Sequence, residues 1–159
     1  QFAEAVEQGI QDAMSNGVLA GFSLIDLKVS LIAGGYLEET STEVAFTIAG
    51  VHALRDGAQK ALPALLEPTM KIEVVTPVPF TGEVIGDLNA RHGRIRGMEE
   101  QGGIQVVSAE APLAEMFGYS TRLRSLTQGR ASFTMHFSHY TSVTESTRKV
   151  LIGEPVSPG

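Results

Sequence analysis

The stretch from Pro112 to Ala131, reading PLAEMFGYSTRLRSLTQGRA, constrains the fold more than any other part of the chain. Its apolar residues recur at three- and four-residue steps, so a helix would bury them along one side; they are Leu113, Met116, Phe117, Leu123 and Leu126. Proline suits a helix start, and Gly129 suits its end because glycine adopts left-handed backbone angles easily. The pattern predicts one helix with a core-facing side.

The residues on either side of this helix predict strands. From Ala131 to His139 apolar and polar residues alternate, with Phe133, Met135 and Phe137 on one side, as expected of a half-buried strand. Upstream, the same reasoning predicts strands over Met70–Val75, Arg94–Met98 and Ile104–Ala111. Between the first two strands we expect a helix that begins at Thr76-Pro77 and ends at His92-Gly93. Its core-facing residues would be Phe80, Val84, Ile85 and Leu88. This β-α-β-β-α-β order predicts a ferredoxin-like domain with an antiparallel four-stranded sheet.

The first third of the chain predicts a helix, a strand and a second helix. Phe2–Ser15 is amphipathic, and Leu24–Ile32 alternates as a strand does. Thr40 and Glu43 stand at capping-box spacing before a helix expected over Ser41–Lys60. These three elements cannot pair both edges of the strand. The unit therefore looks incomplete, and its unpaired strand would join another chain or favour aggregation.

The fold class expected is therefore α+β, with a domain over 1–64 and a ferredoxin-like domain over 65–142. The tail 143–159 is rich in Ser, Thr, Pro and Gly and is expected to be partly disordered, with Val150–Ile152 as a short packed piece.

Composition narrows the class of protein. The chain has no cysteine, which excludes disulfides and thiolate metal sites, and no apolar run approaches the length of a membrane span. Gln1–Gly9 lacks the features of a signal peptide. We expect a cytoplasmic chain without a membrane partner. The net charge of -6 also argues against indiscriminate nucleic-acid binding, and no DNA partner is expected.

No catalytic or cofactor site is predicted. The chain has no G-x-x-x-x-G-K-[ST] phosphate loop and no nucleophile elbow. His136 and His139 would point to opposite faces of a strand, which disfavours a metal site. Binding remains. The outer sheet positions, Ser132, Thr134, Lys71 and Glu73, include no aromatic residue for base stacking, so phosphates and RNA shape are the expected targets.

Positive charge is concentrated late in the chain and forms the candidate RNA-binding set. Residues 1 to 60 have a balance of -5 and residues 61 to 159 a balance of -1. The set consists of Arg91, Arg94 and Arg96 in one group and Arg122, Arg124 and Arg130 in the other. The alternative interpretation is a set of solvated surface arginines.

Three blocks carry a family resemblance: the stretch Pro112–Ala131, LLEPTMKIEVVTP at Leu65–Pro77, and GEVIGDLNARHGRIRGME at Gly82–Glu99. They closely resemble the C-terminal part of bacterial elongation factor G, the ribosomal translocase. The resemblance covers about Phe2 to Tyr140. It implies part of domain IV, as a partial split β-α-β domain, followed by domain V, in a fragment without the GTPase domain. It also implies ribosomal RNA, and the tRNA and mRNA at the decoding site, as partners. GTP and Mg²⁺ would belong to the full-length parent, with no cofactor in this fragment.

The resemblance also identifies the turn GYLEETST as the domain IV tip, which reaches the decoding site in the family and usually reads GSYHEVDSSE. The tip residues are Tyr36, Leu37, Glu38, Glu39, Thr40 and Ser41. Leu37 stands where the family has histidine, and Thr40 where it has aspartate. Leucine can neither donate a hydrogen bond nor carry charge. Leu37 is thus either a neutral replacement or a sign of a specialised parent.

Two further functions stay open. One is a divergent paralogue that acts in ribosome recycling or in ribosome protection, since such relatives share this architecture. The other, from a different class, is a stand-alone ferredoxin-like regulator that binds a small ligand. The length of the gene would distinguish this regulator from part of a translation factor.

Overall fold

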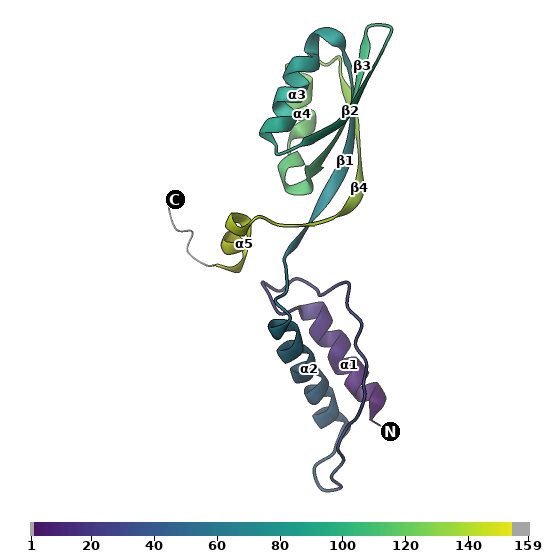
Figure 1. Ribbon diagram of the computed structural model, residues 1–159, viewed down its shortest axis with the longest axis vertical. Helices are drawn as coiled ribbons and strands as arrows, with labels where there is room; N and C mark the ends of the chain where they lie inside the picture. The colour runs from purple at the N-terminus through teal and green to yellow at the C-terminus, as the bar shows by residue number, and fades with distance from the viewer. Residues whose placement is uncertain (1, 154–159) are drawn as a thin grey trace. The chain divides into compact units, whose positions relative to one another are not determined.

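The computed structural model describes residues 2–153, and Figure 1 shows the course of the chain. Leu66–Val143 form one compact unit, and the described residues on either side of it are grouped into the other. We describe each unit by itself.

The unit Leu66–Val143 is a four-stranded antiparallel sheet with two helices on one face (Figure 1). Its strand order is β2-β3-β1-β4, so the first and third strands lie in the middle. The predicted α+β class and ferredoxin-like arrangement are confirmed. The elements are β1 (Leu66–Pro77), α3 (Thr81–Ala90), β2 (Arg94–Gln101), β3 (Ile104–Pro112), α4 (Tyr119–Leu126) and β4 (Ser132–Ser142), with short 3-10 turns η1 (Val78–Phe80) and η2 (Leu113–Met116) before the helices.

The core lies between this sheet and its helices. Ile72 and Val74 of β1 are completely buried, because alternation along the strand turns them toward the helices. They pack with Val84 and Leu88 of α3, as predicted, and with Leu123 of α4. β3 contributes Val107, Ala109 and Ala111. Because these buried residues must face the helices, the strand register is determined. The register in turn determines which residues face away from the helices.

The prediction of one helix over Pro112–Ala131 is wrong. The turn η2 ends at Met116, Phe117 is extended, and Gly118 adopts a left-handed conformation at φ 72°. The side chain of Phe117 is 77% exposed, although the helical pattern predicted its burial. The break is stable because Arg91 donates hydrogen bonds to the carbonyls of Glu115 and Phe117, which a continuous helix would have paired internally. Gly129 is left-handed after α4, as expected.

The start of α3 also differs from the prediction. Thr76 and Pro77 belong to β1, where the Thr76 side chain is fully buried, and they do not cap the helix. The chain passes through η1 and enters α3 at Thr81. The predicted end is confirmed: His92 has left-handed backbone angles, and the Gly93 amide returns to the carbonyl of Leu88 at 2.8 Å.

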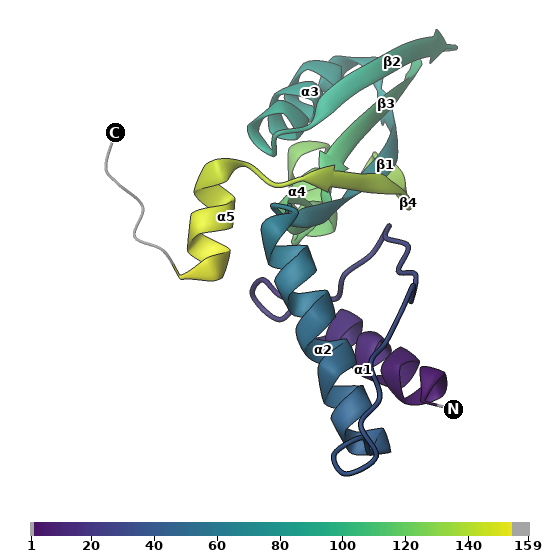
Figure 2. The ribbon, with the colours of Figure 1, turned by 60° about the horizontal axis from the view of Figure 1, so that its bottom comes forward.

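The N-terminal unit contains two packed helices, α1 (Ala3–Asn16) and α2 (Glu43–Lys60), which lie side by side in Figures 1 and 2. Glycines allow their backbones to approach closely. A Cβ atom on Gly9 would stand 2.0 Å from the carbonyl oxygen of Thr47, and one on Gly50 would stand 2.6 Å from that of Val6. Both distances are too short for a side chain, so the helix contact depends on these two glycines.

The predicted strand Leu24–Ile32 is not formed. The segment has no sheet partner among residues 2–153, and Asp26 within it bends the chain with a left-handed φ of 58°. Most of its apolar side chains are exposed. A strand requires a neighbour for its backbone hydrogen bonds, and alternation in the sequence does not supply one.

The prediction of a capping box between Thr40 and Glu43 is also wrong. Thr42 caps α2 instead, since its Oγ1 accepts from the amide of Ala45 at 3.1 Å.

The C-terminal tail contains more structure than expected. β4 runs to Ser142, and α5 (Glu145–Ile152) follows with Thr144 as its N-cap. The predicted packed piece Val150–Ile152 lies in α5, where no residue is buried. Residues 154–159 of the predicted disordered tail lie outside the described residues. Within the described range, no helix combines the length and hydropathy that crossing a membrane requires.

Candidate nucleic-acid interface

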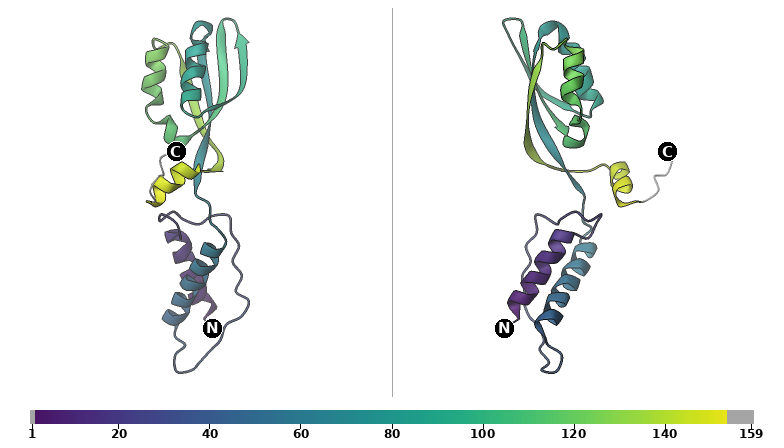
Figure 3. Two further views of the ribbon diagram at one scale, coloured as in Figure 1. Left: turned by 60° about the vertical axis from the view of Figure 1, so that its left-hand side comes forward. Right: turned by 180° about the vertical axis from the view of Figure 1, so that it is seen from behind.

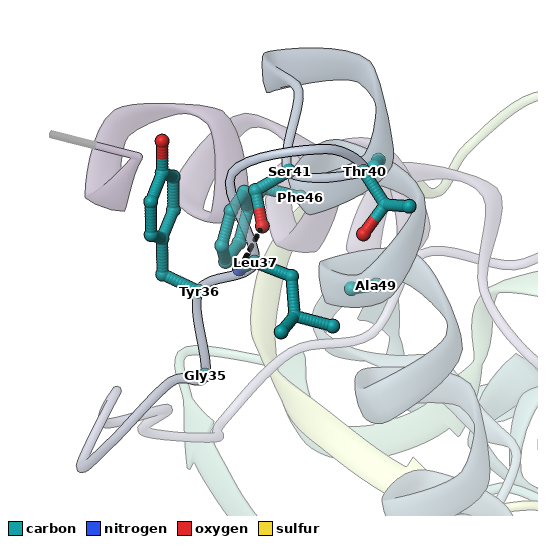
Figure 4. A pocket seen from close by; sticks show the side chains of 8 residues that line it. Gly35, Tyr36, Leu37, Thr40, Ser41, Phe46 and Ala49 are labelled. Atoms are coloured by element: carbon teal, nitrogen blue, oxygen red, sulfur yellow. Dashed lines mark hydrogen bonds between the residues drawn. The ribbon is translucent and has the colours of Figure 1, made fainter.

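The tip turn, residues 35–42, is fixed by backbone hydrogen bonds around Leu37 (Figure 4). The Leu37 amide donates to the Ser41 hydroxyl at 2.9 Å, and the Ser41 amide donates back to the Leu37 carbonyl at 2.9 Å. Thr40 donates to the same carbonyl at 3.1 Å. Polar side chains in such turns replace missing secondary-structure hydrogen bonds. The position of Leu37 is therefore well defined although its side chain is 70% exposed.

Aromatic stacking attaches the tip to the two helices. The ring of Phe2 stacks on Phe46 with centroids 4.5 Å apart and on Tyr36 with centroids 5.9 Å apart. A hollow of about 440 Å³ lies beside this stack, between the turn and the start of α2. Its lining is mostly apolar and consists of Gly35, Tyr36, Leu37, Thr40, Ser41, Ala45, Phe46 and Ala49 (Figure 4).

The tip is acidic. Glu38 and Glu39 lie in the turn and Glu43 in the first turn of α2, while the sequence has no lysine or arginine between Lys28 and Arg55. The positive end of the α2 dipole offsets part of this charge. Phosphates are therefore disfavoured here, and hydroxyl or apolar contacts are the ones this turn offers.

The predicted arginine set does not form one surface. Four of the six arginines lie on the helix layer of the unit, in or next to α3 and α4: Arg91, Arg122, Arg124 and Arg130. Arg94 and Arg96 lie on β2, and the guanidinium of Arg96 reaches Glu110 of β3 with its Nε at 2.8 Å from the carboxylate. Glu110 follows the buried Ala109 and precedes the buried Ala111, so it faces away from the helices.

Among the arginines of the set that form an ion pair, Arg91 is the least exposed. Its side chain is 19% exposed and contacts Asp87 at 2.9 Å, besides donating to the two carbonyls around Phe117. Its guanidinium also lies over the ring of Tyr119, 5.3 Å from the centroid. These contacts engage Nε and Nη1 of the guanidinium within the chain. The surroundings of Arg91 therefore suit holding its own loop better than binding a ligand.

Arg122 and Arg130 also have partners within the chain, but they remain exposed. Arg122 contacts Asp87 at 3.2 Å with 56% of its side chain accessible. Arg130 lies over the ring of Phe80, with 5.9 Å between the guanidinium carbon and the centroid. Arg124 is exposed on the last turn of α4. These three side chains can still reach a ligand.

Tyr119 was missed by the sequence analysis. It is completely buried at the start of α4 and meets Phe133 edge-to-face at 4.9 Å. Its hydroxyl has no hydrogen-bond partner among the described residues. Burial, with a smaller contribution from Asp87, raises the pKa of Tyr119. The sequence feature that could have identified Tyr119 is its position directly after Gly118, because a glycine can break a helix. Over residues 2–153, no group of three or more His, Asp or Glu side chains is placed to hold a metal ion.

Comparison with known proteins decides the family. Residues 1–62 match the family model described as "Elongation factor G, domain IV", and residues 64–151 match "Elongation factor G C-terminus". This chain belongs to the elongation factor G family. It is 53% identical over 154 residues to the elongation factor G of Aquifex pyrophilus, which covers 97% of this chain and 22% of that relative. The chain thus spans about a fifth of the length of this curated relative.

A solved structure agrees with the family and the fold. A crystal structure of a protein from Thermus thermophilus superposes with a TM-score of 0.86 at 41% identity, over 95% of this chain and 23% of that one. The resemblance to elongation factor G in the sequence analysis is therefore confirmed. The roles of individual arginines and tip residues stay predictions.

Proposed function

We propose that this chain is the C-terminal, ribosome-binding part of a translational GTPase that promotes movement of tRNA and mRNA on the ribosome. The observation that carries the proposal is the succession of two adjacent family matches, domain IV over 1–62 and the C-terminus over 64–151. We propose domain boundaries at 1–64 and 65–142, with a tail over 143–159. Such a protein would act in the cytoplasm, where ribosomes translate.

Ribosomal RNA is the partner proposed for the second domain. Arg94, Arg96, Arg122, Arg124 and Arg130 are exposed and can contact phosphates, whereas the contacts of Arg91 favour a structural role. Phosphate contacts of this kind position a protein on RNA without reading its sequence. The tip, Tyr36 to Ser41, is the part proposed to approach the tRNA and mRNA. Its acidic charge favours contacts through hydroxyls and apolar surface.

GTP and Mg²⁺ are assigned to another part of the parent. No lysine in this chain follows a glycine, so the residues of a phosphate loop are missing, and Lys60 is paired with Asp56 at 2.6 Å. The residues present therefore do not fit the nucleotide, and no step of GTP hydrolysis is derived from them.

A competition experiment tests this proposal. The purified chain should release no phosphate from GTP with ribosomes present, yet it should lower the ribosome-stimulated GTP hydrolysis of an intact elongation factor G in a dose-dependent way. A matched control is the chain after heat denaturation, which should not compete. Phosphate release by the chain itself above a blank, or no competition at saturating concentration, would refute the proposal.

One observation favours a second candidate, a divergent paralogue that acts in recycling or ribosome protection. Leu37 has an exposed side chain on a hydrogen-bonded turn. The resemblance to elongation factor G places a histidine at this position. A leucine there removes a hydrogen-bonding group and presents an apolar one. The parent would then translocate slowly or serve another ribosomal step. The Leu37→His variant described in the Discussion distinguishes the two candidates.

A further inference from the structure

The hollow beside the tip turn lies within the N-terminal unit, at the end of the helix pair where α1 and α2 both begin (Figure 3). Its apolar walls come from the turn and from the first two turns of α2: Tyr36, Leu37, Ala45, Phe46 and Ala49 (Figure 4). The volume of about 440 Å³ falls within the range of small-ligand sites, roughly 300 to 1,000 Å³. A whole side chain of a partner can therefore enter it.

An aromatic stack gives this hollow a firm wall. Phe2 stacks on both Tyr36 and Phe46, with interplanar angles of 18° and 10°, so the three rings hold one another in place. Tyr36 and Phe46 line the hollow, and the Tyr36 side chain is nevertheless 60% exposed. An aromatic face that is held in place and open to solvent attracts a cation, and the planar guanidinium of arginine stacks on such a face.

The rim of the hollow is acidic. Glu38 and Glu39 lie in the turn and Glu43 in the first turn of α2, and all three side chains are exposed. Glu4, in the first turn of α1, adds a fourth exposed carboxylate at this end of the helix pair. The starts of the two helices oppose these four negative charges with roughly half a positive charge each, about +1 in all. A net charge of about -3 remains at this end.

The basic residues closest in sequence do not offset this charge. Between Lys28 and Arg55 the sequence has neither lysine nor arginine. Lys28 has Asp26 two residues before it, so the charges of these two residues cancel. Arg55 lies in α2 well beyond Glu43, roughly 18 Å farther along the helix axis at 1.5 Å per residue. The hollow thus combines apolar walls with a rim that favours cations and repels phosphates.

We propose that the hollow binds an arginine side chain from a basic segment of a protein partner. A guanidinium is planar, permanently charged and weakly hydrated, so it can stack on Tyr36 while its aliphatic stem packs against Leu37 and Ala49. Its remaining donors can reach the carboxylates of the rim. This inference rests on the proposed function, since it gives the tip of a ribosome-binding chain a protein partner in addition to RNA.

The test follows nuclear magnetic resonance signals of the isotope-labelled chain during titration with the peptide acetyl-Gly-Arg-Gly-Arg-Gly-amide. Amide signals of residues 35–42 and the methyl signals of Leu37 should shift and reach saturation. The same peptide with citrulline in place of arginine keeps the shape of the side chain but loses its charge. It should bind roughly tenfold more weakly, because the hydrogen bonds to the carboxylates are then no longer charge-assisted.

One variant removes the charge of the rim. Glu38→Gln/Glu39→Gln/Glu43→Gln should weaken the affinity for the arginine peptide roughly tenfold, since three favourable charge interactions are lost. The matched control removes the same charge elsewhere in the unit, through Glu7→Gln/Asp12→Asn/Asp26→Asn, and should have a smaller effect. Circular dichroism checks that each variant is folded.

A second variant fills the hollow without changing its charge. Ala49 is exposed on α2 and lines the hollow, so Ala49→Leu should abolish the shifts without disturbing the fold. Ala53→Leu makes the same change one turn later on α2, at another exposed position, and should leave binding unaltered.

Several results would overturn the inference. They are equal affinity for the arginine and citrulline peptides, equal loss in the rim variant and its control, and unchanged binding by Ala49→Leu. A lysine peptide that binds as tightly as the arginine peptide would also overturn it, because a lysine has no plane to stack on Tyr36. So would a uridine oligonucleotide that shifts the same signals at equal concentration, since the hollow would then accept RNA.

The competition experiment with intact elongation factor G separates this inference from the proposed function. A chain that competes on ribosomes but does not bind the arginine peptide contradicts the arginine site alone. A chain that binds the peptide, and loses it through Ala49→Leu, but never competes on ribosomes contradicts the proposed function and leaves the arginine site standing.

Discussion

Asp87 accepts a hydrogen bond from Nε of Arg122 at 3.2 Å, which joins helix α3 to helix α4. The same carboxylate, 11% exposed, accepts from Arg91 at 2.9 Å. Two arginines that look alike in the sequence therefore share one buried acid but differ in their surroundings. Arg91 is enclosed and holds the loop before α4, whereas Arg122 is mostly in solvent.

Arg91→Ala should destabilise the chain far more than Arg122→Ala. Removal of Arg91 leaves two carbonyls without their donor and weakens the pairing of Asp87, at a cost of about 2 to 4 kcal/mol. Arg122 is exposed, so its ion pair should contribute less than about 1 kcal/mol. Urea unfolding followed by circular dichroism measures both. Equal effects of the two substitutions would mean that Arg91 does not hold the loop.

Tyr119 should make the chain sensitive to alkaline pH. Burial raises its pKa above the unfolded value of about 10, so the folded state keeps the proton while the unfolded state loses it. Its contribution to stability is complete below pH 10 or so. Above that pH the free energy of unfolding should fall by roughly 1.4 kcal/mol per pH unit from this group.

Tyr119→Phe isolates this effect. The substitution should cost little at pH 7, because the hydroxyl has no hydrogen-bond partner among the described residues, and it should remove the alkaline loss due to Tyr119. Unfolding at pH 7 and at higher pH, for both proteins, gives the comparison. Tyr140→Phe is the matched control, since Tyr140 is half exposed. Parallel alkaline losses in the chain and in Tyr119→Phe would contradict the assignment.

Gly9→Ala should separate α1 from α2. Alanine normally stabilises a helix by about 1 kcal/mol relative to glycine, but the new methyl group would collide with the Thr47 carbonyl. We expect net destabilisation of about 1 to 3 kcal/mol. Gly57→Ala is the control, because nothing lies within 4 Å of its Cβ position, and it should stabilise the chain. Stabilisation by both alanines would show that the helices are not in close contact at Gly9.

Leu37→His tests the role of the tip in the full-length parent. If Leu37 makes the parent a specialised factor, single-turnover translocation should become faster in the variant, because histidine restores a hydrogen-bonding group at the fixed turn. Leu37→Ala serves as the control for lost apolar surface. A parent that already matches an ordinary translocase from the same cell, with no gain in the variant, would make Leu37 a neutral replacement.

Periodicity predicted the ferredoxin-like unit well, because each strand there is paired and each helix covers the sheet. Ile72, Val84 and Leu88 follow from alternation and helical spacing alone, and all three are buried. The chain leaves α3 at His92-Gly93 as predicted, and His92 has left-handed backbone angles there. Local and tertiary preferences agree at these positions, and the sequence is easy to interpret there.

The errors lie where a distant partner decides the structure. Leu24–Ile32 alternates like a strand, but pairing depends on a neighbour that the pattern does not contain. The helix predicted from Pro112 breaks at Gly118 because Arg91, more than twenty residues away in sequence, satisfies the carbonyls of the loop. The capping residue of α2 was misplaced by two positions, an ordinary uncertainty of helix ends.

The sequence predicted which charged residues belong to the candidate interface, but it did not predict how they are arranged in space. Charge counts identified the six arginines, yet only strand register shows that Arg94 and Arg96 lie with Lys71 on one face of the sheet. Charge counts also could not reveal that Asp87 holds Arg91 in place. These distinctions depend on contacts between elements far apart in the sequence.

The central claim, that this chain binds the ribosome, is tested most directly by sedimentation of the purified chain with isolated large and small ribosomal subunits. The account predicts saturable pelleting with the large subunit, weakened steeply as salt rises because phosphate contacts release counterions. The Leu37→His variant, altered only at the tip, should pellet as the parent chain does. A chain that stays in the supernatant with large subunits at low salt, while remaining folded by circular dichroism, would contradict the account.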